Sequence, residues 1–289
     1  MMVRQMLKLI RPKQWIKNVF VLVPLVFSKT FTHPDAVLRA LYAMVCFIAA
    51  SSAIYILNDI IDIEKDKLHE TKRLRPLASG SVTKGSAAVF MVALLVGSLV
   101  ASWLIHPSVV LCIVAYVVIN ILYTLVLKKI AILDIMVISL GFVLRVISGA
   151  AAIQVYISSW VLVCTFFIAL CLAAGKRKSE KASLQENSGH HRKVLLSYTD
   201  DFLKSLIQIS VTGTFITYAL YTILEYANQL PMITILFVFF GLFRYMQLIL
   251  EEQEGRLPEE IILSDKPLIA SILLFGVAWI VIFLVSGSM

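Results

Sequence analysis

The chain has 289 residues, of which 60% are hydrophobic and only 15% are charged. This composition excludes an ordinary soluble domain, because apolar runs of about 20 residues recur throughout the chain. The formal net charge of +8 is therefore interpreted through membrane topology, and we expect no nucleic-acid partner.

The recurring apolar runs predict an all-α polytopic membrane protein with nine transmembrane helices. The first run is the least regular, because it is short and contains Lys17, Asn18 and Pro24. The nine predicted spans are Trp15–Phe31, Ala36–Leu57, Ser86–Ile105, Ser108–Leu127, Ile132–Ala152, Ser158–Ala174, Leu203–Leu224, Met232–Leu250 and Leu268–Val285.

Basic residues alternate between the two ends of these spans. All but Lys29, Arg39, Arg145 and Arg244 of the 26 Lys and Arg residues fall on the side of the amino terminus and the longer loops. The positive-inside rule places that side in the cytoplasm. We expect no removable signal peptide, since no small-residue cleavage site follows the basic amino terminus.

The most informative motif begins where the second span ends, in the segment from Tyr55 to Asp66. On a helix, the angles measured from Asn58 are about 40° for Asp62, about 60° for Tyr55, about 80° for Asp66 and about 100° for Asp59. Three carboxylates on one arc repel each other, and Mg²⁺ relieves such repulsion through oxygen ligands. The pattern favours a Mg–diphosphate site over the alternative, a solvated acidic helix end.

Several basic residues near this motif are candidate phosphate ligands. Lys72 and Arg75 lie in a Pro- and Gly-bounded turn that follows the acidic helix, where a basic turn suits a lid over phosphate groups. Lys128 and Lys129 end the fourth span. Lys17 lies about one turn inside the first span, where it either anchors the chain at the interface or contacts a phosphate. For the basic turn, the alternative is orientation charge alone.

Two further basic features lie in and after the later spans. Arg145 is deep in the fifth span, so we expect it to line a cavity, or else to pair with an acid or with backbone carbonyls. Lys176, Arg177 and Lys178 end the sixth span, and Tyr198 precedes the seventh. The latter group indicates an anion site for a lipid phosphate at headgroup level, or else orientation charge.

These motifs resemble the UbiA superfamily of intramembrane prenyltransferases over nearly the whole chain. The resemblance rests on the nine spans, the NDxxDxxxD motif at Asn58–Asp66 and the charged segment after the sixth span. It implies one domain, residues 1–289, with nine helices ringed around a cavity open to lipid and cytoplasm. It also implies Mg²⁺ on a diphosphate, with loops of about 59–85 and 175–202 as a cap.

One departure from the family pattern points to a particular branch. The second acidic motif, DxxxD, is replaced after the sixth span by GKRKSEK, so cations stand where the family has anions. A site with acids at one end and cations at the other end suits one diphosphate that is bound through a metal and one phosphate that is bound without a metal. RPKQWIKN, KRxRPxAxG, FVLRxxxGA, GKRKSE and HRKVLxxYT are similar to the decaprenyl-phosphate phosphoribosyltransferases.

That resemblance implies transfer of 5-phosphoribose from phosphoribosyl diphosphate to a polyprenyl phosphate for cell-envelope polysaccharide precursors. The implied metal ligands are Asn58, Asp62 and Asp66, with Asp59 beside them. Lys72, Arg75 and Lys129 would bind the phosphates of the sugar donor, and Tyr55 would orient its ribose. Lys17 and Arg145 would steer either phosphate, and the acceptor would be bound by Lys176, Arg177 and Lys178. Lys128 and Tyr198 are further candidate substrate contacts.

Two other functions remain open from the residues alone. The first is an ordinary prenyltransferase that uses a prenyl diphosphate, against which the missing second acidic motif argues. The second is a transporter, against which the concentration of charge at one surface argues. The sequence leaves open whether the protein is a homo-oligomer.

Overall fold

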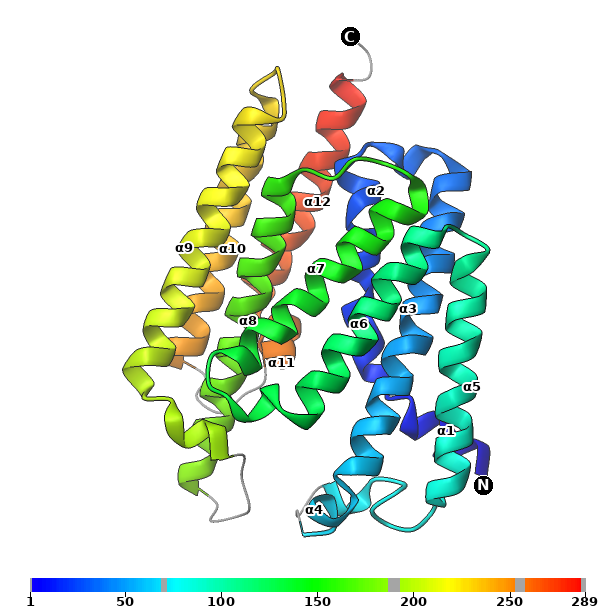
Figure 1. Ribbon diagram of the computed structural model, residues 1–289. Coiled ribbons are helices and arrows are strands. Elements are labelled where there is room, and N and C mark those ends of the chain that lie inside the picture. The colour runs from blue at the N-terminus through cyan, green and yellow to red at the C-terminus, as the bar shows by residue number, and fades with distance from the viewer. Residues whose placement is uncertain (1, 69–71, 187–192, 253–257, 287–289) are drawn as a thin grey trace. The chain divides into compact units, whose positions relative to one another are not determined.

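The computed structural model describes residues 2–68, 72–186, 193–252 and 258–286, and within these ranges the chain forms helices and turns without a β-strand (Figure 1). The all-α prediction is confirmed. The chain divides into two compact units, one of residues 1–128 and 141–157, the other of residues 129–140 and 158–289. Helix α7 (Leu133–Ile153) contributes to both units.

Eight helices in the described ranges are long and apolar enough to cross a membrane. They correspond to the second through ninth predicted spans. Their bounds are α3 Pro34–Ile61, α5 Lys84–Trp103, α6 Pro107–Leu125, α7 Leu133–Ile153, α8 Ser159–Glu186, α9 Asp200–Leu224, α10 Ile235–Gln247 and α12 Lys266–Ser286. Helix α10 is extended by the 3₁₀ turn η6 (Leu230–Thr234) and the π-helical turn η7 (Leu248–Glu252).

The first predicted span, Trp15–Phe31, is wrong as a regular α-helix. This segment forms the 3₁₀ helix η1 (Pro12–Leu22), the short helix α2 (Val23–Phe27) and the turn η2 (Thr30–Thr32). Pro24 has no N–H to donate to the carbonyl of Phe20, and the N–H of Val23 bonds to that carbonyl instead. At about 2.0 Å per 3₁₀ residue and 1.5 Å per α residue, η1 and α2 still reach about 30 Å.

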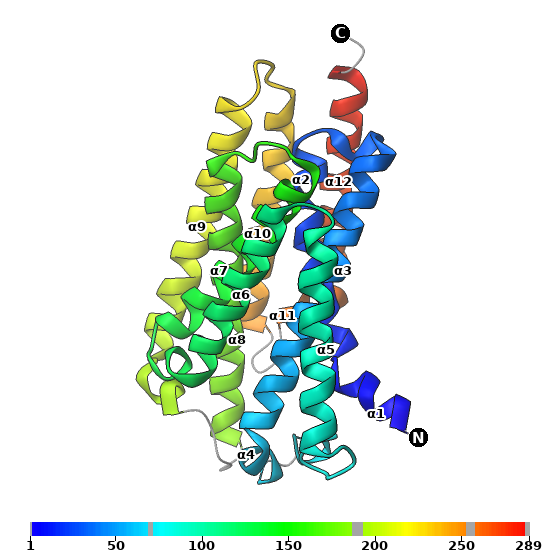
Figure 2. The ribbon, with the colours of Figure 1, turned by 45° about the vertical axis from the view of Figure 1, so that its right-hand side comes forward.

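The first unit is built around α3. Small buried residues of α3 let neighbouring helices approach closely, and the Ser98 hydroxyl of α5 donates to the Cys46 carbonyl at 2.7 Å. Figures 1 and 2 show α5 beside α3 along much of its length. Phe47, Ile113 and Tyr116 form the centre of this apolar core.

The second unit is built on the pairing of α8 with α9, and α10 packs against both α9 and α12. Its core includes Cys171, Ile207, Val211 and Leu242. Helix α8 continues to Glu186, so the residues expected to begin a cap loop at position 175 are helical instead.

The two predicted cap loops contain more helix than expected. Residues 59–85 hold the end of α3, the helix α4 (Ile63–Lys67) and the turn η3 (Lys72–Leu74). Residues 175–202 hold the end of α8, the turn η5 (Lys193–Ser197) and the start of α9. Residues 69–71 and 187–192 of these loops lie outside the described ranges.

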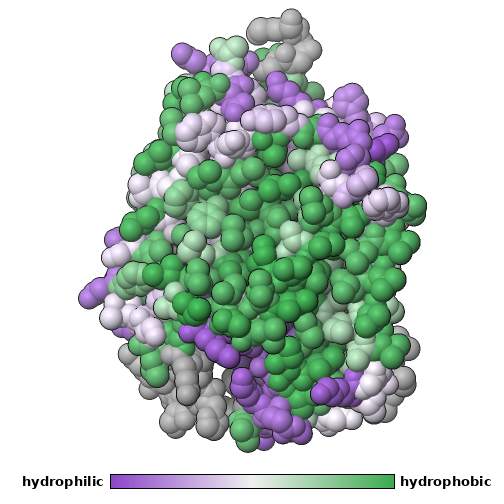
Figure 3. Space-filling view, viewed as in Figure 1, coloured by the Kyte–Doolittle hydropathy of each residue, from purple (hydrophilic) through white to green (hydrophobic). Residues whose placement is uncertain are grey.

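The surface matches a lipid environment along the helices. On the face in Figure 3, apolar side chains cover the middle of the helices, and hydrophilic side chains gather toward helix ends. Large apolar residues of α5, among them Val89, Val92 and Val96, are exposed in the structure. Lipid would cover such residues without the cost of hydrating them.

Gly149 of α7 marks a close approach of two backbones in the first unit. A Cβ atom at this position would lie 1.9 Å from the carbonyl oxygen of Val21 in η1. We predict that Gly149→Ala lowers the free energy of unfolding by roughly 1–3 kcal/mol, because the backbones must separate. The measurement is thermal unfolding of the purified protein in detergent.

Gly97→Ala is the matched control for this prediction. A Cβ at Gly97, in α5, meets no heavy atom within 4 Å. Alanine is also the better helix former, so this variant should unfold at the wild-type temperature or slightly above it. Equal destabilisation by both substitutions would contradict the close-approach explanation.

Candidate active site

The acidic motif lies at the junction of α3 and α4. Helix α3 ends at Ile61, and Asp62 adopts φ −96° and ψ 11° between the two helices. The helical path still continues, since the N–H of Asp62 donates to Asn58 at 2.9 Å and the N–H of Asp66 to Asp62 at 2.8 Å. The predicted arc is therefore formed by two helical segments with a break at Asp62.

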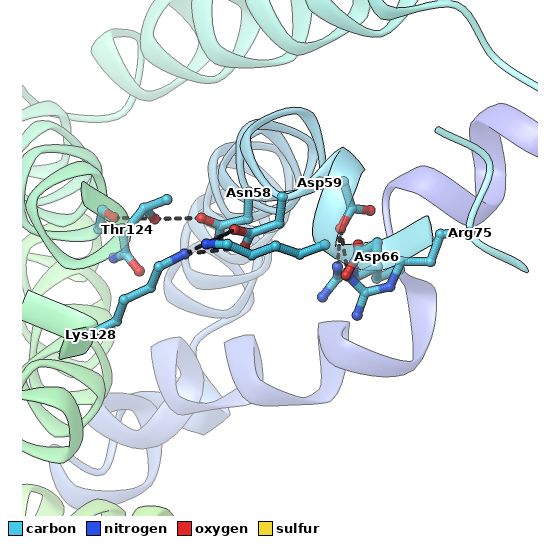
Figure 4. Close-up of polar contacts among 10 residues, drawn as sticks. Asn58, Asp59, Asp66, Arg75, Thr124 and Lys128 are labelled. Carbon is cyan, nitrogen blue, oxygen red and sulfur yellow. Dashed lines mark hydrogen bonds and ion pairs between the residues drawn. The ribbon is translucent and has the colours of Figure 1, made fainter. Parts of the chain in front are cut away.

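The polar side chains on this arc divide into two sets (Figure 4). Asn58 accepts a hydrogen bond from Thr124, and Asp62 pairs with Lys128 at 3.1 Å. Asp59 and Asp66 share one nitrogen of Arg75, at 3.0 Å and 2.7 Å. This division follows the helical wheel, because Asn58 and Asp62 occupy one edge of the arc and the other two acids the opposite edge.

Arg11 completes the second set, and the sequence reasoning missed it as a site residue. Its guanidinium pairs with Asp59 and lies 5.2 Å from the centre of the Tyr55 ring. The backbone of Arg11 is left-handed, with φ 49°, immediately before Pro12. Such a conformation is costly for a residue other than glycine. The sequence signal that could have pointed to Arg11 is its position in an Arg-Pro dipeptide directly before an apolar run that contains Trp15.

Nearby cations offset the effect of burial at Asp62. Burial acts to raise the pKa of Asp62, but the hydrogen bonds and charges of Lys128 and Lys65 outweigh burial and hold that pKa below its ordinary value. Asp59 and Asp66 are both buried and both contact guanidinium groups. The motif is thus a set of carboxylates with resident counter-ions.

Arg145 is held inside the first unit by neutral groups. Its N–H groups donate to the Asn18 side chain at 2.8 Å, the Gly141 carbonyl at 2.8 Å and the Tyr116 hydroxyl at 3.1 Å. The side chain is 4% exposed, and the rings of Phe47, Tyr116 and Phe142 surround the guanidinium. One of these three partners is a backbone carbonyl, the kind of partner that the alternative interpretation of Arg145 expects. The steering role of Arg145 stays a prediction.

In the second unit, a buried cluster surrounds Asp134, which the sequence reasoning did not include in a site. Arg177 donates to Asp134 at 2.7 Å and to Glu180 at 2.6 Å. The Tyr198 hydroxyl donates to Asp134 at 2.5 Å and accepts from the N–H of Ile132 at 2.6 Å. Burial and this bond to Asp134 raise the pKa of Tyr198, so its hydroxyl stays protonated.

These contacts change how the basic segment of α8 is understood. Arg177 is 1% exposed and Lys178 is 7% exposed, and the Lys178 ammonium donates to the Ile249 carbonyl in the π-helical turn η7 at 3.0 Å. Both side chains therefore serve the packing of the second unit. Lys176 is half-buried and remains the better candidate for an acceptor phosphate.

The other predicted site residues occupy varied surroundings. Lys17, Tyr55 and Lys72 are half-buried in the first unit, together with the acids. Lys129 is exposed and belongs to the second unit. The predicted donor-phosphate set is therefore divided, with Lys72 and Arg75 in the unit that carries the acids.

The donor set at the end of α3 fits a hard divalent cation in its chemistry. Asn58, Asp62 and Asp66 each carry a side-chain oxygen, the kind of ligand that Mg²⁺ prefers. In the described ranges, no three His, Cys, Asp or Glu side chains already converge as a metal-binding group. Because Lys128 and Arg75 contact the acids, a metal would have to compete with these cations.

Residues 19–264 match the UbiA prenyltransferase family, and the chain belongs to that family. The fold agrees, since an Archaeoglobus fulgidus UbiA homolog bound to DMAPP and Mg²⁺ superposes with a TM-score of 0.75 at 17% identity. That alignment covers 96% of this chain and 98% of the other. The chain is accordingly a multi-pass membrane protein.

Among curated proteins, the chain is similar to several that are named decaprenyl-phosphate phosphoribosyltransferase. It is 36% identical to the protein from Mycolicibacterium smegmatis over 76% of this chain and 70% of that one. It is 32% identical to the Mycobacterium tuberculosis protein over 96% and 93% of the two chains. It is 34% identical to the Corynebacterium glutamicum protein over 91% and 82%.

The buried cluster around Asp134 leads to a stability prediction. Arg177→Ala would leave a buried carboxylate without its cation, so we expect a loss of roughly 3–5 kcal/mol of unfolding free energy. Replacing both partners, as in Arg177→Met with Asp134→Leu, should recover part of that loss. Thermal unfolding in detergent measures both effects.

Lys181→Ala is the control for this prediction. Lys181 pairs with Asp200 at 2.9 Å, but the two side chains are 22% and 58% exposed. Exposed pairs contribute about 0–1 kcal/mol, so this variant should unfold close to the wild type. The prediction fails if Arg177→Ala is no more harmful than Lys181→Ala.

Proposed function

We propose that the protein transfers 5-phosphoribose from 5-phosphoribosyl 1-diphosphate to a polyprenyl phosphate and releases diphosphate. The observation that carries this proposal is the similarity to named decaprenyl-phosphate phosphoribosyltransferases, at 32% identity over 96% of the chain for one of them. The arrangement of acids and cations at the α3–α4 junction supports it. The product would serve the synthesis of cell-envelope polysaccharide precursors.

In this reaction, a phosphate oxygen of the lipid forms a bond to C1 of the ribose as the bond from C1 to the diphosphate oxygen breaks. The lipid phosphate is largely ionised at neutral pH, so no general base is needed. The protein must align the reactants, neutralise the leaving diphosphate and exclude water. A bound Mg²⁺ would neutralise charge on the leaving group.

The roles of the acidic motif follow from its contacts. Asn58, Asp62 and Asp66 are the proposed Mg²⁺ ligands, and the position of Asp59 between Arg11 and Arg75 suits a residue that orients those cations. The Mg²⁺-bound structure of the Archaeoglobus fulgidus homolog supports use of a divalent metal in this fold.

Basic residues would then bind the phosphate groups of both substrates. Lys72, Arg75, Lys128 and Lys129 are proposed for the sugar donor, and Lys176 for the lipid phosphate. Tyr55 would orient the ribose. Lys17 and Arg145 would act through the positive potential that they add to the first unit, since Arg145 has no carboxylate among its contacts in the described part of the chain.

We further propose that the active site faces the cytoplasm of a bacterium, with the amino terminus on the same side. The alternation of basic residues along the chain supports this orientation. The segments around residues 59–85 and 175–202 would cover the site. The similar proteins from Mycobacterium tuberculosis and Corynebacterium glutamicum support a bacterial source, and the long apolar helices support a location in the inner membrane.

A second candidate function is prenyl transfer from a prenyl diphosphate to another acceptor. The prenyl-diphosphate-bound homolog favours it only through the shared fold, at 17% identity. Separate incubations with labelled phosphoribosyl diphosphate and labelled prenyl diphosphate distinguish the two reactions. Mass spectrometry should detect a polyprenyl-phosphate-linked phosphoribose in the first incubation, and label transfer in the second alone would reject the proposal.

The metal assignment leads to a prediction about Asp62. Asp62→Asn keeps the shape of the side chain but removes its charge, so we expect turnover to fall at least about 100-fold without loss of folding. Formation of the labelled lipid product measures turnover, and thermal unfolding reports on folding.

Glu64→Gln is the matched control, because it removes the same charge two residues away. Glu64 pairs with Lys67 at 2.8 Å, and its side chain is 83% exposed. This variant should keep nearly full turnover. Full activity in Asp62→Asn would remove Asp62 from the metal site.

The acceptor assignment leads to a prediction about Lys176. Loss of one charge-assisted contact to the lipid phosphate should raise the KM for polyprenyl phosphate about tenfold in Lys176→Ala. The KM for phosphoribosyl diphosphate should change less. Steady-state kinetics with each substrate varied in turn measure both values, and Lys181→Ala on the same helix is the control. A larger change for the sugar donor would reverse the assignment.

A further inference from the structure

We propose that Lys128 and Arg75 are resident counter-ions of the acidic motif, which the metal and the diphosphate replace together. The metal would then bind strongly only when a diphosphate is present to accept the displaced cations. This inference rests on the proposed function for its substrate class, but it concerns how the motif is loaded and goes beyond the reaction itself.

Lys128 occupies the Asp62 carboxylate. Its ammonium lies 3.1 Å from one carboxylate oxygen and 3.4 Å from the other. The two side chains are 16% and 25% exposed, so water screens this pair only in part. A divalent ion that approached Asp62 would meet a like charge already in contact with both ligand atoms.

Arg75 occupies the other edge of the motif in the same way. One guanidinium nitrogen bonds to both Asp59 and Asp66, at 3.0 Å and 2.7 Å. The side chains of these acids are only 3% and 7% exposed. Arg75 thus neutralises carboxylates that would otherwise repel each other.

The free energy of metal binding should therefore differ between a bare metal ion and a metal ion that binds together with diphosphate. The bare ion must displace Lys128 and leave a partly buried ammonium without an anion. A diphosphate offers oxygen atoms to the displaced Lys128 and Arg75, and these cations then bind the substrate in place of the acids. Metal and diphosphate should each increase the affinity of the other by the same factor.

The first set of measurements is Mn²⁺ binding to the full chain in detergent, with free Mn²⁺ quantified by electron paramagnetic resonance. Titrations are run with and without inorganic diphosphate, and a protein-free mixture of the same composition corrects for Mn²⁺ chelated in solution. We expect diphosphate to tighten Mn²⁺ binding to the wild type at least about tenfold.

Substitutions of Lys128 test the mechanism directly. In Lys128→Met, Mn²⁺ alone should bind about threefold to tenfold more tightly than to the wild type, and the enhancement by diphosphate should shrink by a similar factor. Lys128→Arg keeps the charge and should retain most of the enhancement. Thermal unfolding of each variant confirms that the fold is retained, and Lys128→Arg supplies the comparison if Lys128→Met does not fold.

Lys65→Met is the matched control for charge. Lys65 also pairs with Asp62, at 3.5 Å, but its side chain is 77% exposed. Its removal deletes the same formal charge next to the same acid. The dissociation constants of Mn²⁺ with and without diphosphate should each change less than about twofold. If Lys65→Met reproduces Lys128→Met, the effect is general electrostatics and the proposal is wrong.

Two outcomes would overturn the proposal outright. One is wild-type binding of Mn²⁺ alone that is as tight as binding with diphosphate. The other is weaker binding of Mn²⁺ alone in a folded Lys128→Met. Because the probe is inorganic diphosphate, these results are independent of phosphoribose transfer, which the labelled-substrate assay tests by itself.

Discussion

Pairing of carboxylates with cations at the α3–α4 junction is the constraint on which the first unit depends. Asp59, Asp62 and Asp66 lie within two turns of helix, and their mutual repulsion must be balanced before the helix end can be stable. Arg11, Arg75 and Lys128 supply the balance. These cations come from the residue before η1, the basic turn after α4, and the 3₁₀ turn η4 (Leu127–Lys129) that follows α6. The acids therefore tie separate parts of the unit together and also form its candidate active site.

A second polar network, around Arg145, lies within the membrane-spanning part of the same unit. In this network a cation is stabilised by neutral groups. Arg145 is balanced by the dipoles of Asn18, Gly141 and Tyr116 and by aromatic faces, and no carboxylate is among its contacts in the described part of the chain. A buried cation held this way keeps its positive potential. The contact to Asn18 also explains how the irregular helix η1 packs against α7, where Gly149 permits close approach.

The second unit shows why a basic segment is a poor guide to a binding site when it is considered alone. The GKRKSEK segment stands where the family resemblance leads one to expect acids. Arg177 and Lys178 nevertheless bind Asp134 and the carbonyl of Ile249, so two of its cations hold α8 to α7 and to the turn η7. Cations in a charged motif can thus serve the internal packing of the protein. In this chain, Lys176 is the residue on which the functional interpretation of the segment depends.

The sequence by itself determined the membrane class, eight of the spans and the order of the acids around their helix. These features are local, since bilayer thickness sets the length of an apolar run and helix periodicity sets the direction of side chains. Only the tertiary structure decided that Arg11 and Thr124 contact the acids, that Asp134 pairs with Arg177, and that the first span begins as a 3₁₀ helix. Those features depend on contacts between distant parts of the chain, and no residue spacing encodes such contacts.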